Sequence, residues 1–146
     1  MPSFLGRLVP VAAMLVIAGC NDLTGPESLT LARRMWESQN LSSYHYVVSR
    51  DCFCDGPQGA VEVAVHNDEV VRAFEQSSGT LLDPRNWPTI DDLFAMVQSA
   101  DADDSLIAVE FHEELGYPTR IETCCRANDS GVKYVVTALE PMVFVE

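Results

Sequence analysis

The sequence has few basic residues. Nine lysines and arginines stand against 22 aspartates and glutamates in a chain of 146 residues, which gives a formal net charge of −13. The cations are scattered among carboxylates, whereas a protein that binds nucleic acid needs a clustered basic surface. The composition therefore argues against nucleic acid as a partner, and an acidic surface of this kind favours solubility.

The sequence also lacks common catalytic and metal-binding motifs. It contains neither a Gly-x-Ser-x-Gly nucleophile elbow nor a glycine-rich phosphate loop. His112 does not begin a zinc-protease motif, because Gly116 occupies the place of the second histidine. The acidic segment 101–104 is not an EF-hand loop, because Leu106 and His112 stand where that loop needs glycine and glutamate. We expect no catalytic residue, no metal site and no cofactor, and a solvated linker at 101–104.

The remaining polar candidates do not form an evident cluster. His45, His66 and His112 each fall inside or at the end of an expected strand. We expect these side chains to be solvated or to lie at the edge of the hydrophobic core. Glu113 and Glu114 are neighbours on an extended segment, so their side chains point to opposite sides and share no site.

Only one long apolar run is present, at residues 8–18. It is shorter than the roughly 20 residues that a membrane-spanning helix needs, and it follows one positive charge, Arg7. This order is typical of a signal peptide. Ile17, Ala18 and Gly19 before Cys20 match the lipobox of bacterial lipoproteins, in which the new N-terminal cysteine receives acyl chains such as palmitate.

The lipobox resemblance implies three parts: a signal peptide at 1–19, a lipidated N-terminus and short tether at 20–27, and a single domain at 28–146. It places the protein in the bacterial cell envelope, anchored to membrane lipid through Cys20. In enteric bacteria, an aspartate directly after the acylated cysteine retains a lipoprotein in the inner membrane. Asn21 stands at that position in place of aspartate, which favours the periplasmic face of the outer membrane. The alternatives are an ordinary secretory signal with an incidental cysteine and a buried N-terminal helix.

Cleavage after Gly19 leaves 127 of the 146 residues, enough for one domain with a hydrophobic core. Loss of Arg7 changes the net charge from −13 to −14.

Four further cysteines occur as two close pairs, Cys52 with Cys54 and Cys124 with Cys125. An even number in an exported chain favours disulfides. On one strand, Cys52 and Cys54 would have Cα atoms about 6.6 Å apart, near the upper limit for a direct bond. Bonds between the pairs are attractive, and each would close a loop of about 70 residues worth about 4 kcal/mol. Redox-active thiols and a copper-binding thiolate cluster are the alternatives, since Cys-x-Cys and Cys-Cys fit zinc poorly.

Hydrophobic periodicity predicts two helices. Leu29, Ala32, Met35 and Trp36 form a stripe that predicts a helix over 27–39. Thr89 is a candidate N-cap for a second helix, whose expected buried stripe follows: Ile90, Leu93, Phe94 and Val97.

Alternating residues predict the strands. Residues 44–49 and a hairpin of 61–66 with 70–74, turning at Asn67 and Asp68, precede the second helix. Alternation of Ile107, Val109 and Phe111, then segments 120–123 and 132–139, predict further strands after it. The expected fold is α+β: an antiparallel meander of about six strands with two helices on one face, and a possible tandem αβββ pseudo-repeat. The apolar residues 142–145 are expected to dock on the sheet.

Several short motifs occur together at 43–46 (Tyr-x-Tyr), 52–54 (Cys-Phe-Cys), 61–74, 89–94 and 116–121 (Gly-Tyr-Pro). As a set they resemble an uncharacterised family of bacterial lipoproteins and secreted proteins, a domain of unknown function, over residues 36–139. The resemblance implies no activity, and it supports Cys52 and Cys54 as framework residues.

The leading functional hypothesis is a non-enzymatic envelope module whose sheet face or loops bind a protein partner. One alternative is a thiol-disulfide or copper-handling protein that uses Cys52, Cys54, Cys124 and Cys125. Another is a small-ligand-binding lipoprotein with a cavity between helices and sheet, although aromatic residues at strand and helix spacing more often form a core.

Overall fold

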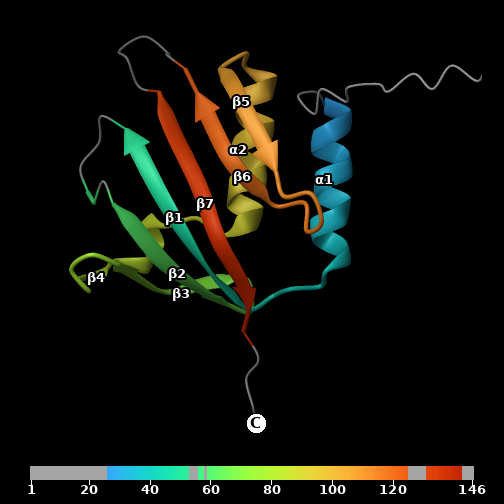
Figure 1. The fold of residues 1–146 in the computed structure, drawn as a ribbon. Coiled ribbons are helices and arrows are strands. Elements are labelled where there is room, and N and C mark those ends of the chain that lie inside the picture. Colours follow the sequence, from blue (N-terminus) through green and yellow to red (C-terminus); the bar gives the residue numbers. More distant parts are fainter. Residues whose placement is uncertain (1–25, 53–55, 58, 125–130, 143–146) are drawn as a thin grey trace, which may run out of the picture.

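The computed structural model of the chain describes residues 26–52, 56–57, 59–124 and 131–142. Within these residues, helices α1 (Pro26–Ser38) and α2 (Ile90–Ala102) lie against one seven-stranded antiparallel sheet (Figure 1). The strands are β1 (Tyr44–Cys52), β2 (Ala60–His66), β3 (Glu69–Glu75), β4 (Leu81–Leu82), β5 (Leu106–Phe111), β6 (Pro118–Thr123) and β7 (Val132–Pro141). A 3₁₀ helix, η1 (Pro84–Asn86), precedes α2.

The strand order is β4-β3-β2-β1-β7-β6-β5. Each half of the sheet is a meander, and β7, the last of the described strands, joins the halves by pairing with both β1 and β6. The α+β class is confirmed. The expected number of about six strands is wrong, because Leu81 and Leu82 form a seventh strand against Phe74 and Ala73. Two residues are too short to show the alternation that identifies a strand.

The pseudo-repeat is not confirmed. The element orders α1-β1-β2-β3 and α2-β5-β6-β7 do occur. However, the two halves meet in the sheet through different strands. The first half meets the second through its first strand, β1, whereas the second half meets the first through its last strand, β7. The two halves therefore have different sheet topologies.

Tyr44 of β1 contacts both helices, which places them on the same face of the sheet. Its ring packs edge-on against Trp36 of α1, with centroids 5.4 Å apart. Its hydroxyl accepts a hydrogen bond from the Ile90 backbone N–H at the start of α2, 2.9 Å away. Burial raises the pKa of Tyr44 and of its neighbour Tyr46 above the usual range, so both hydroxyls stay protonated.

The Tyr46 hydroxyl donates to the backbone carbonyl of Pro88, just before α2. Tyr46→Phe is expected to lower the free energy of unfolding by about 1–2 kcal/mol, because it leaves a part-buried carbonyl without its donor. Urea titration of both proteins measures the difference. Tyr117→Phe is the matched control, since the Tyr117 hydroxyl has no hydrogen bond among the described residues, and it should change stability by less than about 0.5 kcal/mol. Equal losses in the two variants would contradict this role for Tyr46.

The start of α2 agrees with the sequence. The Thr89 hydroxyl accepts from the Asp92 N–H at 3.1 Å, and the Asp92 carboxylate accepts from the Thr89 N–H at 2.8 Å. This reciprocal capping box confirms the N-cap. The expected stripe is also buried, at 1% exposure or less: Ile90, Leu93, Phe94 and Val97.

β5 departs from the expected alternation. Val109 is buried, but Ile107 is 56% exposed. The register shifts between Leu106 and Ala108, so Ile107 is an extra residue in a bulge and does not face the core. The prediction that Ile107 shares the buried face of Val109 is therefore wrong.

Several predictions fall on residues outside the described ones: the signal peptide 1–19, the acylated Cys20 and the docking of 143–145. Among the described residues, neither helix has the length and apolar character needed to cross a bilayer.

Candidate functional site

The C-terminal ends of β1 and β6 flank the start of β7. Cys52 of β1 pairs with Val132 of β7, and Glu122 of β6 pairs with Lys133 of β7. Cys124, the residue after β6, therefore lies at the same end of the sheet as Cys52. We call this the cystine end, because Cys52 and Cys124 are both disulfide-bonded.

The other two disulfide candidates, Cys54 and Cys125, lie outside the described residues. The connectivity of the four cysteines therefore stays a prediction. A disulfide sulfur is not a thiolate, so Cys52 and Cys124 offer no copper ligand in this oxidised state.

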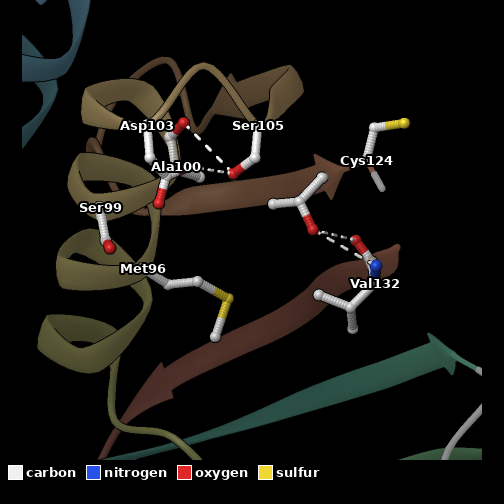
Figure 2. Close-up of a pocket in the computed structure, with 8 residues that line it drawn as sticks. Met96, Ser99, Ala100, Asp103, Ser105, Cys124 and Val132 are labelled. Atoms are coloured by element: carbon white, nitrogen blue, oxygen red, sulfur yellow. Dashed lines mark hydrogen bonds between the residues drawn. The ribbon is translucent and has the colours of Figure 1, made fainter. Parts of the chain in front are cut away.

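A cavity of about 300 Å³ opens at the cystine end, between α2 and the strands (Figure 2). Met96 and Ala100 of α2 and Val132 of β7 supply its apolar surface. Figure 2 shows the Met96 side chain extending from the helix toward the strands. The polar lining residues come from the last turn of α2 and the turn that follows it, and from the end of β6 and the residue after it: Ser99, Asp103, Ser105, Thr123 and Cys124.

The polar groups of this cavity are mostly bonded to one another. The Ser105 hydroxyl donates to the Asp103 carboxylate at 2.5 Å, and the Ser105 carbonyl accepts from the Cys124 N–H at 2.8 Å. The Thr123 hydroxyl accepts from the Val132 N–H at 3.3 Å. The volume is at the lower limit of small-molecule sites, so the cavity could admit only a small ligand. Sequence analysis missed it, because Met96 and Ser99 belong to no motif.

The three histidines serve local structure. The imidazole of His112 accepts through Nδ1 from the N–H groups of Glu114 and Leu115, at 3.3 and 3.2 Å. Nδ1 of His66 lies 3.1 Å from the Ser43 hydroxyl, and Nε2 of His45 lies 3.4 Å from the Glu140 carboxylate. In the described part of the chain, no three His, Cys, Asp or Glu residues are grouped closely enough to hold a metal ion.

The acidic segment 101–104 is only partly a linker. Asp101 lies within the last turn of α2 and Asp103 is the C-cap residue, so the expectation of a linker holds only for the residues after Ala102. A carboxylate near the negative end of the helix dipole is unfavourable, and Asp101 therefore does not stabilise α2.

The sheet face opposite the helices, called here the outer face, carries a central strip of small and β-branched residues. Val47 of β1 pairs with Thr137 of β7, and Ser49 pairs with Val135. On β2 the strip ends, because Glu62 pairs with Val47, and Ala64 pairs with His45. These side chains alternate along their strands with the buried core residues, so they point away from α1 and α2.

Charged residues border this strip. On one side, the Arg120 guanidinium lies 3.2 Å from the Glu110 carboxylate and 2.5 Å from that of Glu122. The hydrogen bond from Arg120 holds the pKa of the Glu122 carboxyl below its usual range. On the other side, the Arg72 guanidinium lies 5.1 Å from the centroid of the Phe74 ring. A strip of small and β-branched side chains bordered by charged groups is compatible with a protein–protein interface, which combines apolar and polar surface.

Fold and surface together define an open-faced α+β domain, with helices on one side of an antiparallel sheet and a mixed apolar and charged surface on the other. The chain belongs to a family of unknown function, DUF6174, whose model matches residues 28–141. The expected uncharacterised domain is thereby confirmed. No curated protein and no solved structure matches the chain.

Proposed function

We propose that this protein is a lipid-anchored component of the bacterial cell envelope, attached through acylated Cys20, and that it binds a protein partner without catalysing a reaction. The observation that carries the proposal is the lipobox at residues 17–20, six residues before the start of α1 at Pro26. This spacing links the anchor closely to the folded domain.

A short tether would fix which end of the domain is near the membrane. Six extended residues span at most about 20 Å. The N-terminal end of α1 lies at the same end of the molecule as the C-terminal end of α2 (Figure 1). The cystine end is therefore the membrane-proximal end, and the 67–68 turn of the β2–β3 hairpin faces away from the membrane.

The outer face supports the binding role. It lies on the side of the sheet that α1 and α2 leave uncovered, and its central strip includes the half-buried side chains of Val47 and Val135. Burial of such apolar surface by a partner is favourable at about 25 cal/mol per Å². The charged border would restrict which partners fit.

The anchor is tested by mass spectrometry of the N-terminal peptide from the membrane fraction. We expect the peptide to begin at Cys20 and to carry acyl chains, and we expect Cys20→Ala to abolish cleavage after Gly19 and acylation. Asn21→Ala is the matched control and should be processed normally, because the lipobox is intact. A peptide that begins at Cys20 without acyl groups would contradict the anchor.

Partner binding is tested by site-specific photo-crosslinking in intact cells. A photoreactive residue in place of Thr137, on the outer face, should yield one reproducible crosslinked product with an envelope protein. The same residue in place of Leu31, which is 56% exposed on α1, is the control and should not yield that product. Absence of any product from Thr137, or the same product from both positions, would contradict binding through the outer face.

The cavity in Figure 2 favours one second candidate, a small-ligand-binding lipoprotein. Met96→Trp would fill the cavity and should abolish binding of such a ligand, as measured by native mass spectrometry of protein extracted from the envelope. Recovery of the protein without any bound small molecule in repeated native extractions would count against this candidate.

A further inference from the structure

We propose that the partner of the outer face is a second copy of this chain, anchored beside the first in the same membrane. The two copies pack outer face against outer face, about a two-fold axis that runs along the strands midway between β1 and β7. The inference rests on the proposed function, because it uses both the lipid anchor and the outer face as a binding surface.

The lipid anchor restricts how two copies can meet. Two copies in the same membrane leaflet must be related by an axis along the membrane normal, because any other two-fold axis would turn one anchor away from the membrane. β1 and β7 run between the membrane-proximal cystine end and the end that carries the 67–68 turn, so this axis is close to parallel to them. The two sheets then pack with their strands aligned, as in a β-sandwich.

The charges of the outer face are complementary about this axis. Rotation about a line midway between β1 and β7 places each outer-face residue of β1 opposite the β7 residue with which it pairs in its own sheet. Asp51 pairs with Lys133, and His45 pairs with Glu140. Asp51 therefore faces Lys133 of the second copy, and His45 faces Glu140 of the second copy. Opposite charges in register favour this contact, whereas the net charge of −13 makes other contacts between copies repulsive.

The centre of the proposed contact is small and uncharged. By the same rotation, Val47 lies opposite Thr137 of the second copy, and Ser49 lies opposite Val135 of the second copy. These four residues are the central strip, and their small side chains let the two sheets approach to about 10 Å. The contact removes apolar surface of Val47 and Val135 from water, which favours association.

The strands beside the strip leave room for the second copy. The rotation places β2 opposite β6 of the second copy, because these strands flank β1 and β7. Arg120 of β6 pairs with Val135 of the strip. Ala60 of β2 pairs with Ser49, which is level with Val135. The long Arg120 side chain therefore lies opposite the small Ala60 of the second copy, and β4, three places from β1, lies outside the contact.

The contact is small, so the membrane is needed to support it. Four strands about 4.8 Å apart and about 20 Å long present roughly 400 Å² on each copy. A pair buries about 800 Å² in total, which is less than most stable complexes bury in solution. Two anchors in one membrane hold the copies at a high effective concentration and offset this weakness. The pair must therefore be tested on the membrane.

Lys133 is the only lysine of the chain, which makes the proposed register testable. A carbodiimide joins a side-chain amine directly to a carboxylate that contacts it, without a spacer. Two full-length copies with different C-terminal tags are produced in the same cells, and the isolated membranes are treated with the carbodiimide. After capture through one tag in denaturing detergent, we expect a two-chain product that carries both tags. Mass spectrometry should find Lys133 of one copy joined to Asp51 of the other.

Variants that remove or move the single amine provide the controls. Bonds that Lys133 forms within its own copy carry one tag and are not counted. Lys133→Arg keeps the charge but removes the amine, so the product with both tags should be lost. Lys133→Arg combined with Arg34→Lys moves the amine to the exposed side of α1, across the sheet from the outer face, and should also lose the product. Circular dichroism confirms that each variant is folded.

Exchange of the two charged residues tests the register itself. The double variant Asp51→Lys with Lys133→Asp keeps one amine and one carboxylate at these positions but reverses their order. Because the two-fold axis sets position 51 against position 133, the exchange should restore a product with both tags that is joined at the same two positions.

Three results would overturn the proposal. They are a wild-type membrane that yields no product with both tags, equal product when the amine is moved to α1, and a bond from Lys133 to a carboxylate outside the outer face. The Thr137 crosslinking described above separates this failure from that of the proposed function. A Thr137 product with a different protein excludes the second copy but keeps the outer face as a binding surface, whereas no Thr137 product removes both.

Discussion

Gly116→Ala is expected to lower the free energy of unfolding by about 3 kcal/mol. Gly116 has a φ of +79°, a left-handed conformation that costs an L-residue about 1–2 kcal/mol. In addition, a Cβ atom at this position would collide with the Ala32 carbonyl oxygen of α1 and lie 2.7 Å from the Met35 Cβ. The backbone of the 112–117 turn contacts the backbone of α1 at this point. Relief of the collision would therefore require a backbone shift, which costs more free energy than rotation of a side chain.

Gly79→Ala is the matched control for the collision. Gly79 also has a positive φ, +69°, but an added Cβ would meet nothing within 4 Å. It therefore carries the conformational cost alone, about 1–2 kcal/mol. Urea titration of both variants gives the difference, which we expect to be at least about 1 kcal/mol. Equal losses at the two sites would show that the close approach of the turn to α1 is not required.

Trp36→Ala is expected to cost about 3–5 kcal/mol. Trp36 is 4% exposed, and its ring packs edge-on against Tyr44 and Tyr117, with centroids 5.4 and 6.3 Å away. Removing the indole leaves a cavity between α1, the start of β1 and the start of β6. Each lost aromatic pair adds about 0.5–1.5 kcal/mol to the loss of buried area.

Leu31→Ala on the same helix is the control for helix propensity. Leu31 is 56% exposed, so its truncation should change stability by less than about 0.5 kcal/mol. Thermal unfolding followed by near-ultraviolet circular dichroism measures both variants. A Trp36→Ala protein as stable as Leu31→Ala would contradict the packing of α1 through Trp36.

The helices and most strands are predictable because local patterns determine them. The first helix was expected at 27–39 and spans Pro26–Ser38, and the N-cap at Thr89 is correct. The Asn67–Asp68 turn is also correct, with positive φ at both residues. In contrast, the exposure of Ile107 depends on a bulge against β6, and β4 depends on its partner β3. Pairing between strands is not contained in the pattern of either strand.

The candidate site is less predictable than the fold. Sequence spacing identified Cys52 and Cys124 as members of close pairs, but only the register of β7 with β1 and β6 shows that they lie at the same end of the sheet. The cavity beside them depends on where the end of α2 crosses the strands. The hydrogen bonds of Tyr44 and Tyr46 to the start of α2 were missed for the same reason, because they join residues more than 40 positions apart.

The central position of β7 determines when the domain can fold. β7 follows all the other described strands in the sequence, yet among the described residues it alone connects the sheet half β1–β4 to the half β5–β6. Until residues 132–141 have been synthesised, β1 and β6 both present unpaired edges, which are prone to aggregate. The sheet can therefore close only after residues 132–141 have been translated, and a nascent chain that still lacks β7 would depend on chaperones to stay soluble.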